Sequence, residues 1–177
     1  MTSQLYVSDL QSTVERAAPA LLLVSEQDST RPRAPGKWSP REEIGHLIDS
    51  ASINQQRFVR VQFQDDLVFA GYRQDDWVRV QRYRDAPWAD LVTLWRALNL
   101  HLARVMAAVP ESVRTRAHRR HNLNEIAFRA VAAEEPATLD YFMADYVDHM
   151  KHHLRQLLGA DWDTKASRRA GPGASAR

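Results

Sequence analysis

Four long segments of this chain carry apolar residues spaced three and four positions apart, the pattern of helices that bury one face. They span residues 4–26, 39–62, 87–109 and 138–159, and the sequence between them shows no clear alternation of the kind found in β-strands. The connection over residues 63–85 is longer than a usual helix-to-helix link, which indicates a crossover. The sequence therefore predicts an all-α four-helix bundle with a long crossover between helices 2 and 3.

The length of 177 residues suits one domain with a sizeable core. Two of the predicted helices begin with capping residues, because Ser39-Pro40-Arg41-Glu42 forms a capping-box pattern and Thr138 can cap the last helix. We expect the bundle domain over residues 1–160 and a disordered C-terminal tail over residues 161–177, which ends in Gly, Ala, Ser and Arg.

Composition and charge argue against several kinds of protein. The formal net charge is +2 and the basic residues are dispersed, so nucleic-acid binding is not expected. No apolar run approaches the roughly 20 residues that cross a membrane, and the N-terminus lacks a signal pattern, so we expect a cytoplasmic protein. Since there is no cysteine, any metal must be held by His, Asp or Glu, and any thiol must come from a cosubstrate.

Histidines gather in the last predicted helix, where His149 and His153 stand four residues apart. At this spacing two imidazoles lie on the same face of a helix and can bind one metal ion. The apolar residues Phe142 and Met150 share or border that face, so the pair should point inward. Inward histidines are also found as ordinary core residues, and both interpretations stay open at this point. His152 is rotated away from the pair and is expected at the rim.

His46 lies off the apolar stripe of its own helix, on the side of Ser50, Ile53, Asn54 and Arg57. These polar neighbours fit either a solvent-exposed surface or the lining of a cleft, and from this helix alone the surface position is favoured. Helical periodicity does not decide between the two.

Residues 111–137 have the least regular pattern of the chain. His118 and His121 belong to this segment, but the arginines beside them oppose the binding of a cation, so a metal site is not expected there. Whether the segment covers a functional site stays open.

Two distant segments together resemble one known family. Residues 36–49, Gly-Lys-Trp-Ser-Pro-Arg-Glu-Glu-Ile-Gly-His-Leu-Ile-Asp, continue to Arg57-Phe58 and resemble the second helix of the DinB-like (DinB/YfiT-type) superfamily of metalloenzymes. Asp145-Tyr146 through His149, His153 and Gln156 resembles its last helix. The order of the two segments and the total length also fit.

The resemblance implies a four-helix bundle that holds a divalent metal ion, zinc, nickel or iron, with three histidines. These fall on His46, His149 and His153. With the resemblance, His46 is expected to be a metal ligand and not a surface residue. Asp49 and Asp145 lie one turn from His46 and His149, and are candidates to hydrogen-bond the ligand imidazoles; either could instead be a charge on the helix surface. Candidates for the pocket wall are Asn54, Arg57, Tyr146 and Gln156.

Three ligands leave coordination positions of the ion open, as in catalytic sites. Together with the resemblance, this implies a metal-dependent transferase or hydrolase that acts on a small molecule, and thiol transfer, which the resemblance suggests, would require a low-molecular-weight thiol as cosubstrate. The alternative is a non-catalytic metal-binding module with a role in stress response or dimerisation. A homodimer is expected because helical bundles of this kind often pair through an exposed helix face.

Overall fold

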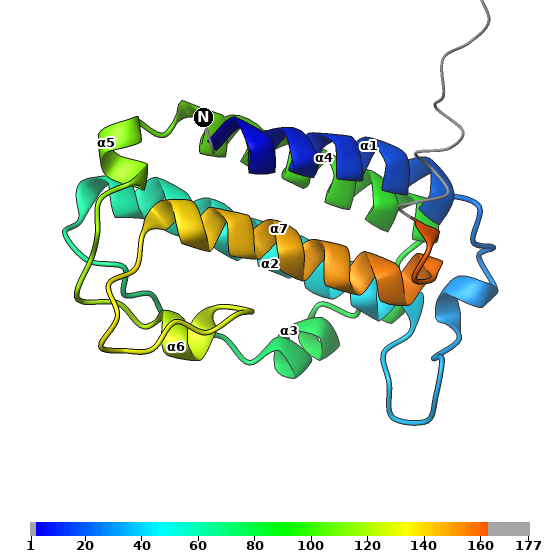
Figure 1. Ribbon diagram of the computed structural model, residues 1–177. Coiled ribbons are helices and arrows are strands. Elements are labelled where there is room, and N and C mark those ends of the chain that lie inside the picture. Colours follow the sequence, from blue (N-terminus) through cyan, green and yellow to red (C-terminus); the bar gives the residue numbers. More distant parts are fainter. Residues whose placement is uncertain (1–2, 163–177) are drawn as a thin grey trace, which may run out of the picture.

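Four long helices form the body of the protein in the computed structural model, which describes residues 3–162 (Figure 1). They are α1 (Ser3–Leu21), α2 (Pro40–Arg60), α4 (Trp88–Ala108) and α7 (Leu139–Leu158). Helices α4 and α7 each pack against both α1 and α2, so the order around the bundle is α1, α4, α2, α7. Within residues 3–162 there is no strand, only two isolated bridges. The predicted all-α four-helix bundle is confirmed.

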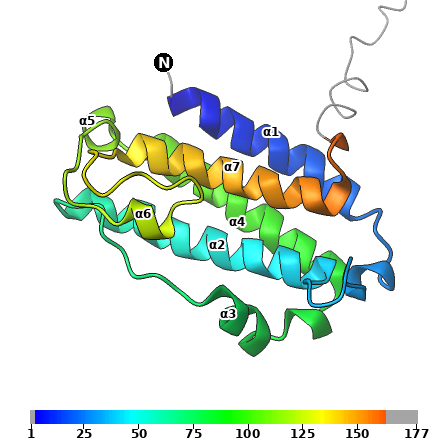
Figure 2. The ribbon, with the colours of Figure 1, turned by 60° about the horizontal axis from the view of Figure 1, so that its bottom comes forward.

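The crossover between the second and third long helices is also present. The start of α2 lies beside the chain that leads into α4, because Arg41 donates a hydrogen bond to the carbonyl oxygen of Arg84 (2.9 Å). Adjacent α2 and α4 therefore run in the same direction, and the chain must return along the outside of the bundle between them (Figure 2). This return contains three short helices, η2 (Val61–Phe63), α3 (Gln74–Val80) and η3 (Tyr83–Asp85).

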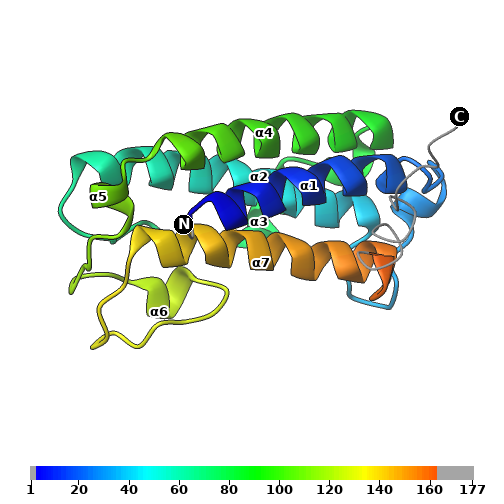
Figure 3. The same cartoon turned by 45° about the horizontal axis from the view of Figure 1, so that its top comes forward.

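The core lies between the four long helices, and each of them contributes side chains that are fully shielded from solvent. The largest of these side chains include Leu10 on α1, Phe58 on α2, Trp95 on α4 and Met143 on α7. The apolar stripes of the sequence thus face one another, which is what makes amphipathic helices associate in water. Figure 3 shows α1, α4 and α7 from the side opposite the crossover.

Local capping fixes the beginnings of α2 and α7. The Ser39 hydroxyl accepts from the Glu42 backbone N–H, and the Glu42 carboxylate accepts from the Ser39 backbone N–H (2.8 Å), so the predicted capping box is present. Thr138 caps α7 by accepting from the Tyr141 backbone N–H (3.1 Å).

The first helix is shorter than predicted. It ends at Leu21, five residues before the expected position, because the chain turns there to form η1 (Asp28–Thr30) against the start of α2. The buried Arg41 side chain donates to the Ser29 hydroxyl (2.9 Å) and also contacts Glu26, which holds this turn in place.

The last described residues pack against the end of α7. Trp162 is buried, and its backbone N–H donates to the Gly159 carbonyl oxygen (3.2 Å), so ordered structure continues past residue 160. Residues 163–177, which hold most of the expected disordered tail, lie outside the described residues. Among the helices of the described part, none has the length and apolar character needed to cross a bilayer.

The segment 111–137 contains α5 (Glu111–Arg114) and α6 (Leu123–Ile126), and it packs against the crossover. Its histidines hold backbone groups in place. His118 donates from Nδ1 to the Asp65 carbonyl oxygen (3.0 Å), and His121 donates from Nε2 to the Glu135 carbonyl oxygen (2.6 Å). Both histidines are buried in these roles.

Candidate metal centre

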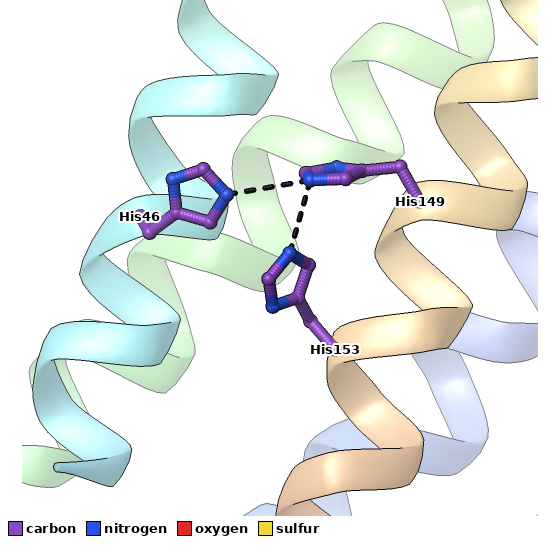
Figure 4. Close-up of side chains that lie close together, drawn as sticks. All are labelled: His46, His149 and His153. Carbon is purple, nitrogen blue, oxygen red and sulfur yellow. Dashed lines mark hydrogen bonds between the residues drawn. The ribbon is translucent and has the colours of Figure 1, made fainter. Parts of the chain in front are cut away.

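The imidazoles of His46, His149 and His153 converge between α2 and α7 (Figure 4). The Nε2 atom of His149 lies 3.3 Å from Nε2 of His46 and 3.0 Å from Nε2 of His153. His46 is buried, and the two histidines of α7 are half-buried. The structure thus brings together the three residues on which the family resemblance placed the metal ligands.

The pattern of its own helix favoured a solvent-exposed position for His46, but helix packing buries this residue. Helix α7 covers the polar side of α2, and contacts such as that between Phe58 and Phe142 (ring centroids 5.6 Å apart) join the two helices. Trp38 closes the site from the other side, with its ring 5.1 Å from that of His46. The side of α2 that looks polar in sequence is therefore an interior surface.

Two of the three imidazoles are held neutral. The pKa of His46 is lowered to about 4, mainly by burial and also by the neighbouring His153, while Glu43 acts in the opposite direction. Burial, together with the neighbouring histidines, lowers the pKa of His149 to about 3. Neutral imidazoles offer lone pairs to a metal ion, which protonated ones do not.

The arrangement of the nitrogens fits a shared divalent ion. Two imidazole nitrogens bound to one tetrahedral zinc ion lie about 3.3 Å apart, given zinc–nitrogen distances of about 2.0–2.1 Å. The two spacings to Nε2 of His149, 3.3 and 3.0 Å, are close to this value, and the three ligand atoms all lie within 4.8 Å of one another. Three ring nitrogens that meet at one point repel one another unless a proton or a cation lies among their lone pairs, so the donor set suits a cation.

Glu43 was not identified from the sequence, although it lies three residues before His46 on the same face of α2. Its carboxylate contacts the Nδ1 atom of His153, which places the ring proton on Nδ1 and directs the Nε2 lone pair toward the other histidines. A carboxylate in this position fixes both the tautomer and the orientation of a ligand imidazole. The spacing of three residues to His46 is the signal that could have identified it.

The two aspartates that were expected to contact ligand imidazoles have other partners. Asp49 accepts hydrogen bonds from the Tyr83 hydroxyl (2.7 Å) and the Gln81 amide (2.6 Å), and so anchors the crossover to α2. The Nδ1 atom of His46 is buried without a hydrogen-bond partner among residues 3–162. Asp49 lies one helical turn from His46, but its hydrogen-bond donors come from the crossover.

Asp145 hydrogen-bonds to the loop that follows α6 through both oxygens of its carboxylate. It is buried and accepts from the backbone N–H groups of Phe128 and Arg129 (both 2.8 Å), so it fixes the loop that follows α6. This loop forms part of the cavity wall, so the segment 111–137 does reach the candidate metal site.

A cavity of about 490 Å³ opens beside the three histidines. Asn54 and Arg57 line it from α2 and Tyr146 lines it from α7, as the sequence suggested for the pocket wall. Other sides are formed by residues 125–128 and by Tyr72 of the crossover. A volume of this size accommodates a small molecule.

Gln156 does not reach this cavity. It is exposed, contacts the exposed His152 (2.8 Å), and lines a second hollow of about 420 Å³ on the other side of His153. His152 itself lies at the rim of the main cavity, where it was expected.

Fold and site together define a helical bundle with a three-histidine cluster that suits a metal ion. The model of the DinB superfamily matches residues 9–174, so the chain belongs to this superfamily. Among solved structures, YfiT from Bacillus subtilis has the same fold, with a TM-score of 0.71 over 97% of this chain and 89% of that chain, at 19% identity. That protein is described as a probable metal-dependent hydrolase with an unusual four-helix bundle topology. No curated protein matches the sequence.

Proposed function

We propose that this protein is a divalent-metal-dependent hydrolase that acts on a small molecule, with the ion held by His46, His149 and His153. The observation that carries the proposal is the convergence of three Nε2 atoms at the edge of a cavity of about 490 Å³. The description of YfiT as a metal-dependent hydrolase supports the same class of reaction.

When bound, a divalent ion would supply Lewis acidity to a water molecule and to a substrate oxygen. The protein's own groups provide the conditions for this chemistry. Burial keeps His46 and His149 neutral, and Glu43 holds the proton of His153 on Nδ1, so three lone pairs are directed to one point. The donor set suits zinc, nickel or iron(II), since imidazole binds all of them.

A thiol of a cosubstrate could replace water as the nucleophile at the same ion, which would make the protein a thiol transferase. The chain has no cysteine, so no internal thiol competes for the site. The two reactions use the same residues and differ in the nucleophile, so they are separated by assay.

The proposal is tested by metal content and turnover. We expect one divalent ion per chain in wild-type protein by mass spectrometry, and its loss in His46→Ala and in His149→Ala, whereas His101→Ala, an exposed histidine of α4, keeps it. Metal-loaded protein should then hydrolyse members of a panel of esters and amides. Turnover only when thiols and electrophiles are supplied would indicate the transferase. Bound metal without turnover in either panel would indicate the non-catalytic module.

A further inference from the structure

Arg57 is a buried cation in the wall of the cavity. Its side chain is only 7% exposed, and no carboxylate within residues 3–162 forms an ion pair with it. Arginine stays protonated in proteins even where burial lowers its pKa, as it does here. A buried charge without a counter-ion is costly, so proteins rarely keep one unless a ligand completes the pair.

The contacts of Arg57 orient its guanidinium without neutralising it. One nitrogen donates to the Asn54 side-chain oxygen (3.3 Å) and another to the Ala70 carbonyl oxygen (2.9 Å). The guanidinium carbon also lies 5.8 Å from the ring centroids of both Phe69 and Phe142. Two of the five N–H groups of an arginine are thus used, and the other three have no protein acceptor in the described part of the chain.

Arg57 shares this cavity with the histidine cluster. A row of buried polar side chains leads from one to the other along α2, formed by His46, Ser50, Asn54 and Arg57. His46 and Arg57 lie about three turns apart, and the arginine reaches back by one turn to Asn54, so about two turns, or about 11 Å, separate the two groups. The aromatic rings of Phe142 and Tyr146 line the cavity from α7.

We infer that Arg57 binds a carboxylate of the substrate, at the end of the cavity away from the metal-binding histidines. This inference rests on the proposed function, because it assigns a substrate class to the same site. A guanidinium and a carboxylate match in geometry and form paired hydrogen bonds. Arg57 is the one Arg or Lys among the described residues that line the cavity, which suits a singly charged carboxylate and not a phosphate dianion. The substrate class is a small carboxylic acid whose reacting group is separated from the carboxylate by an apolar portion.

The test measures carboxylate binding by metal-free protein at pH 8, so that coordination to a metal does not contribute. The probes are 3-phenylpropionate and its neutral amide, titrated by calorimetry. Wild-type protein should bind the acid at least about tenfold more tightly than the amide, as expected for charge-assisted hydrogen bonds. Arg57→Met should remove this preference, and Arg57→Lys should retain part of it. Arg60→Met, which changes an exposed arginine of the same helix, should leave it unchanged.

Circular dichroism of each variant shows whether it has folded. If Arg57→Met does not fold, Arg57→Lys provides the test, because it keeps a positive charge at this position. Equal binding of acid and amide by wild-type protein would overturn the inference, and so would an unchanged preference in a folded Arg57→Met or Arg57→Lys variant. Metal content is measured separately, on protein that has been incubated with zinc and then freed of unbound ion. Bound metal without a carboxylate preference would reject this inference alone, whereas absence of metal would reject the proposed function on which it rests.

Discussion

The contact between Glu43 and His153 is the residue-scale feature on which the metal centre depends most directly. Both side chains are half-buried, and the carboxylate holds the imidazole in the orientation in which Nε2 faces the other two histidines. Neither side chain would be fixed by its own helix alone, because long side chains on a helix surface have several rotamers. The contact between Glu43 and His153 therefore orients the His153 imidazole for metal binding in the metal-free protein.

Replacing Glu43 by Gln should weaken metal binding by about tenfold or more, which is the usual effect of removing a carboxylate behind a ligand histidine. The amide preserves the shape of the side chain but no longer stabilises the partial positive charge that the metal induces on the imidazole. Competition with a chelating dye measures the affinity. Glu15→Gln, which changes a surface partner of Arg96, serves as the control. Equal affinities in the two variants would contradict the role given to Glu43.

The stability of the metal-free protein should depend on pH because of His46 and His149. Their pKa values fall from 6.5 to about 4 and about 3 on folding, so the folded protein binds fewer protons than the unfolded chain below pH 6.5. Stability therefore rises with pH in this range, and it is lost as the pH falls from about 6.5 towards 4, by up to about 3 kcal/mol per histidine.

Urea unfolding of metal-free protein between pH 4.5 and 7.5 measures this dependence. His149→Gln should reduce the slope, since one of the two titrating groups is then absent. An equal slope in wild-type and His149→Gln protein would show that other groups cause the pH dependence.

At the scale of the elements, the crossover is held against α2 through one glycine. A Cβ atom at Gly45 would lie 2.1 Å from Cδ2 and 2.3 Å from Cγ of the Tyr83 ring. The hydroxyl of the same tyrosine donates to Asp49, one turn further along α2. Burial and this bond also raise the pKa of Tyr83, so it remains the donor. The absence of a side chain at residue 45 thus allows the crossover to pack next to His46.

Gly45→Ala should destabilise the protein by about 1–3 kcal/mol, because the buried ring of Tyr83 must move to make room. Urea unfolding gives the change in free energy. Gly71→Ala is the matched control, since a Cβ atom at Gly71 meets nothing within 4 Å. A loss no larger than that of Gly71→Ala would mean that the crossover is not packed as described.

The loop after α6 depends on Asp145 in a similar way. Asp145→Ala removes the acceptors of two backbone N–H groups, so we expect a loss of about 2 kcal/mol and faster hydrogen exchange at Phe128 and Arg129. Asp148→Ala removes only a side-chain contact to Arg129 and should leave exchange at these amides nearly unchanged. Similar exchange in the two variants would argue against an anchoring role.

At the scale of the whole molecule, the histidine cluster joins two helices that are distant in sequence. An ion bound by His46 and His149 would connect α2 to α7 in the folded state only, so metal binding should stabilise the entire bundle. A free concentration of one hundred times Kd adds about 2.7 kcal/mol, which corresponds to about 5–10 °C in Tm for a chain of this size.

Thermal unfolding with and without zinc measures this effect, and a chelator should reverse it. His101→Ala should show the full increase in Tm and His46→Ala should show none. An increase of similar size in both variants would indicate that zinc binds elsewhere.

Local sequence determined much of this fold. Caps such as Ser39 and Thr138 act on groups within three residues of themselves, so the starts of α2 and α7 could be predicted closely. His149 and His153 share a face because a spacing of four residues fixes their relation within one helix. Apolar periodicity likewise predicted the four helices and, through the length of the connection, the crossover.

Tertiary structure decided what the polar side chains around the histidine cluster meet. Whether His46 faces solvent or the interior depends on the position of α7, and the partners of Asp49 and Asp145 come from the crossover and from the loop after α6. That Arg57 lines the cavity beside the histidines is visible only once the surrounding chain is in place. Periodicity in one segment records which side of a helix is polar, but the element that covers that side is brought there by long-range packing, which no local pattern encodes.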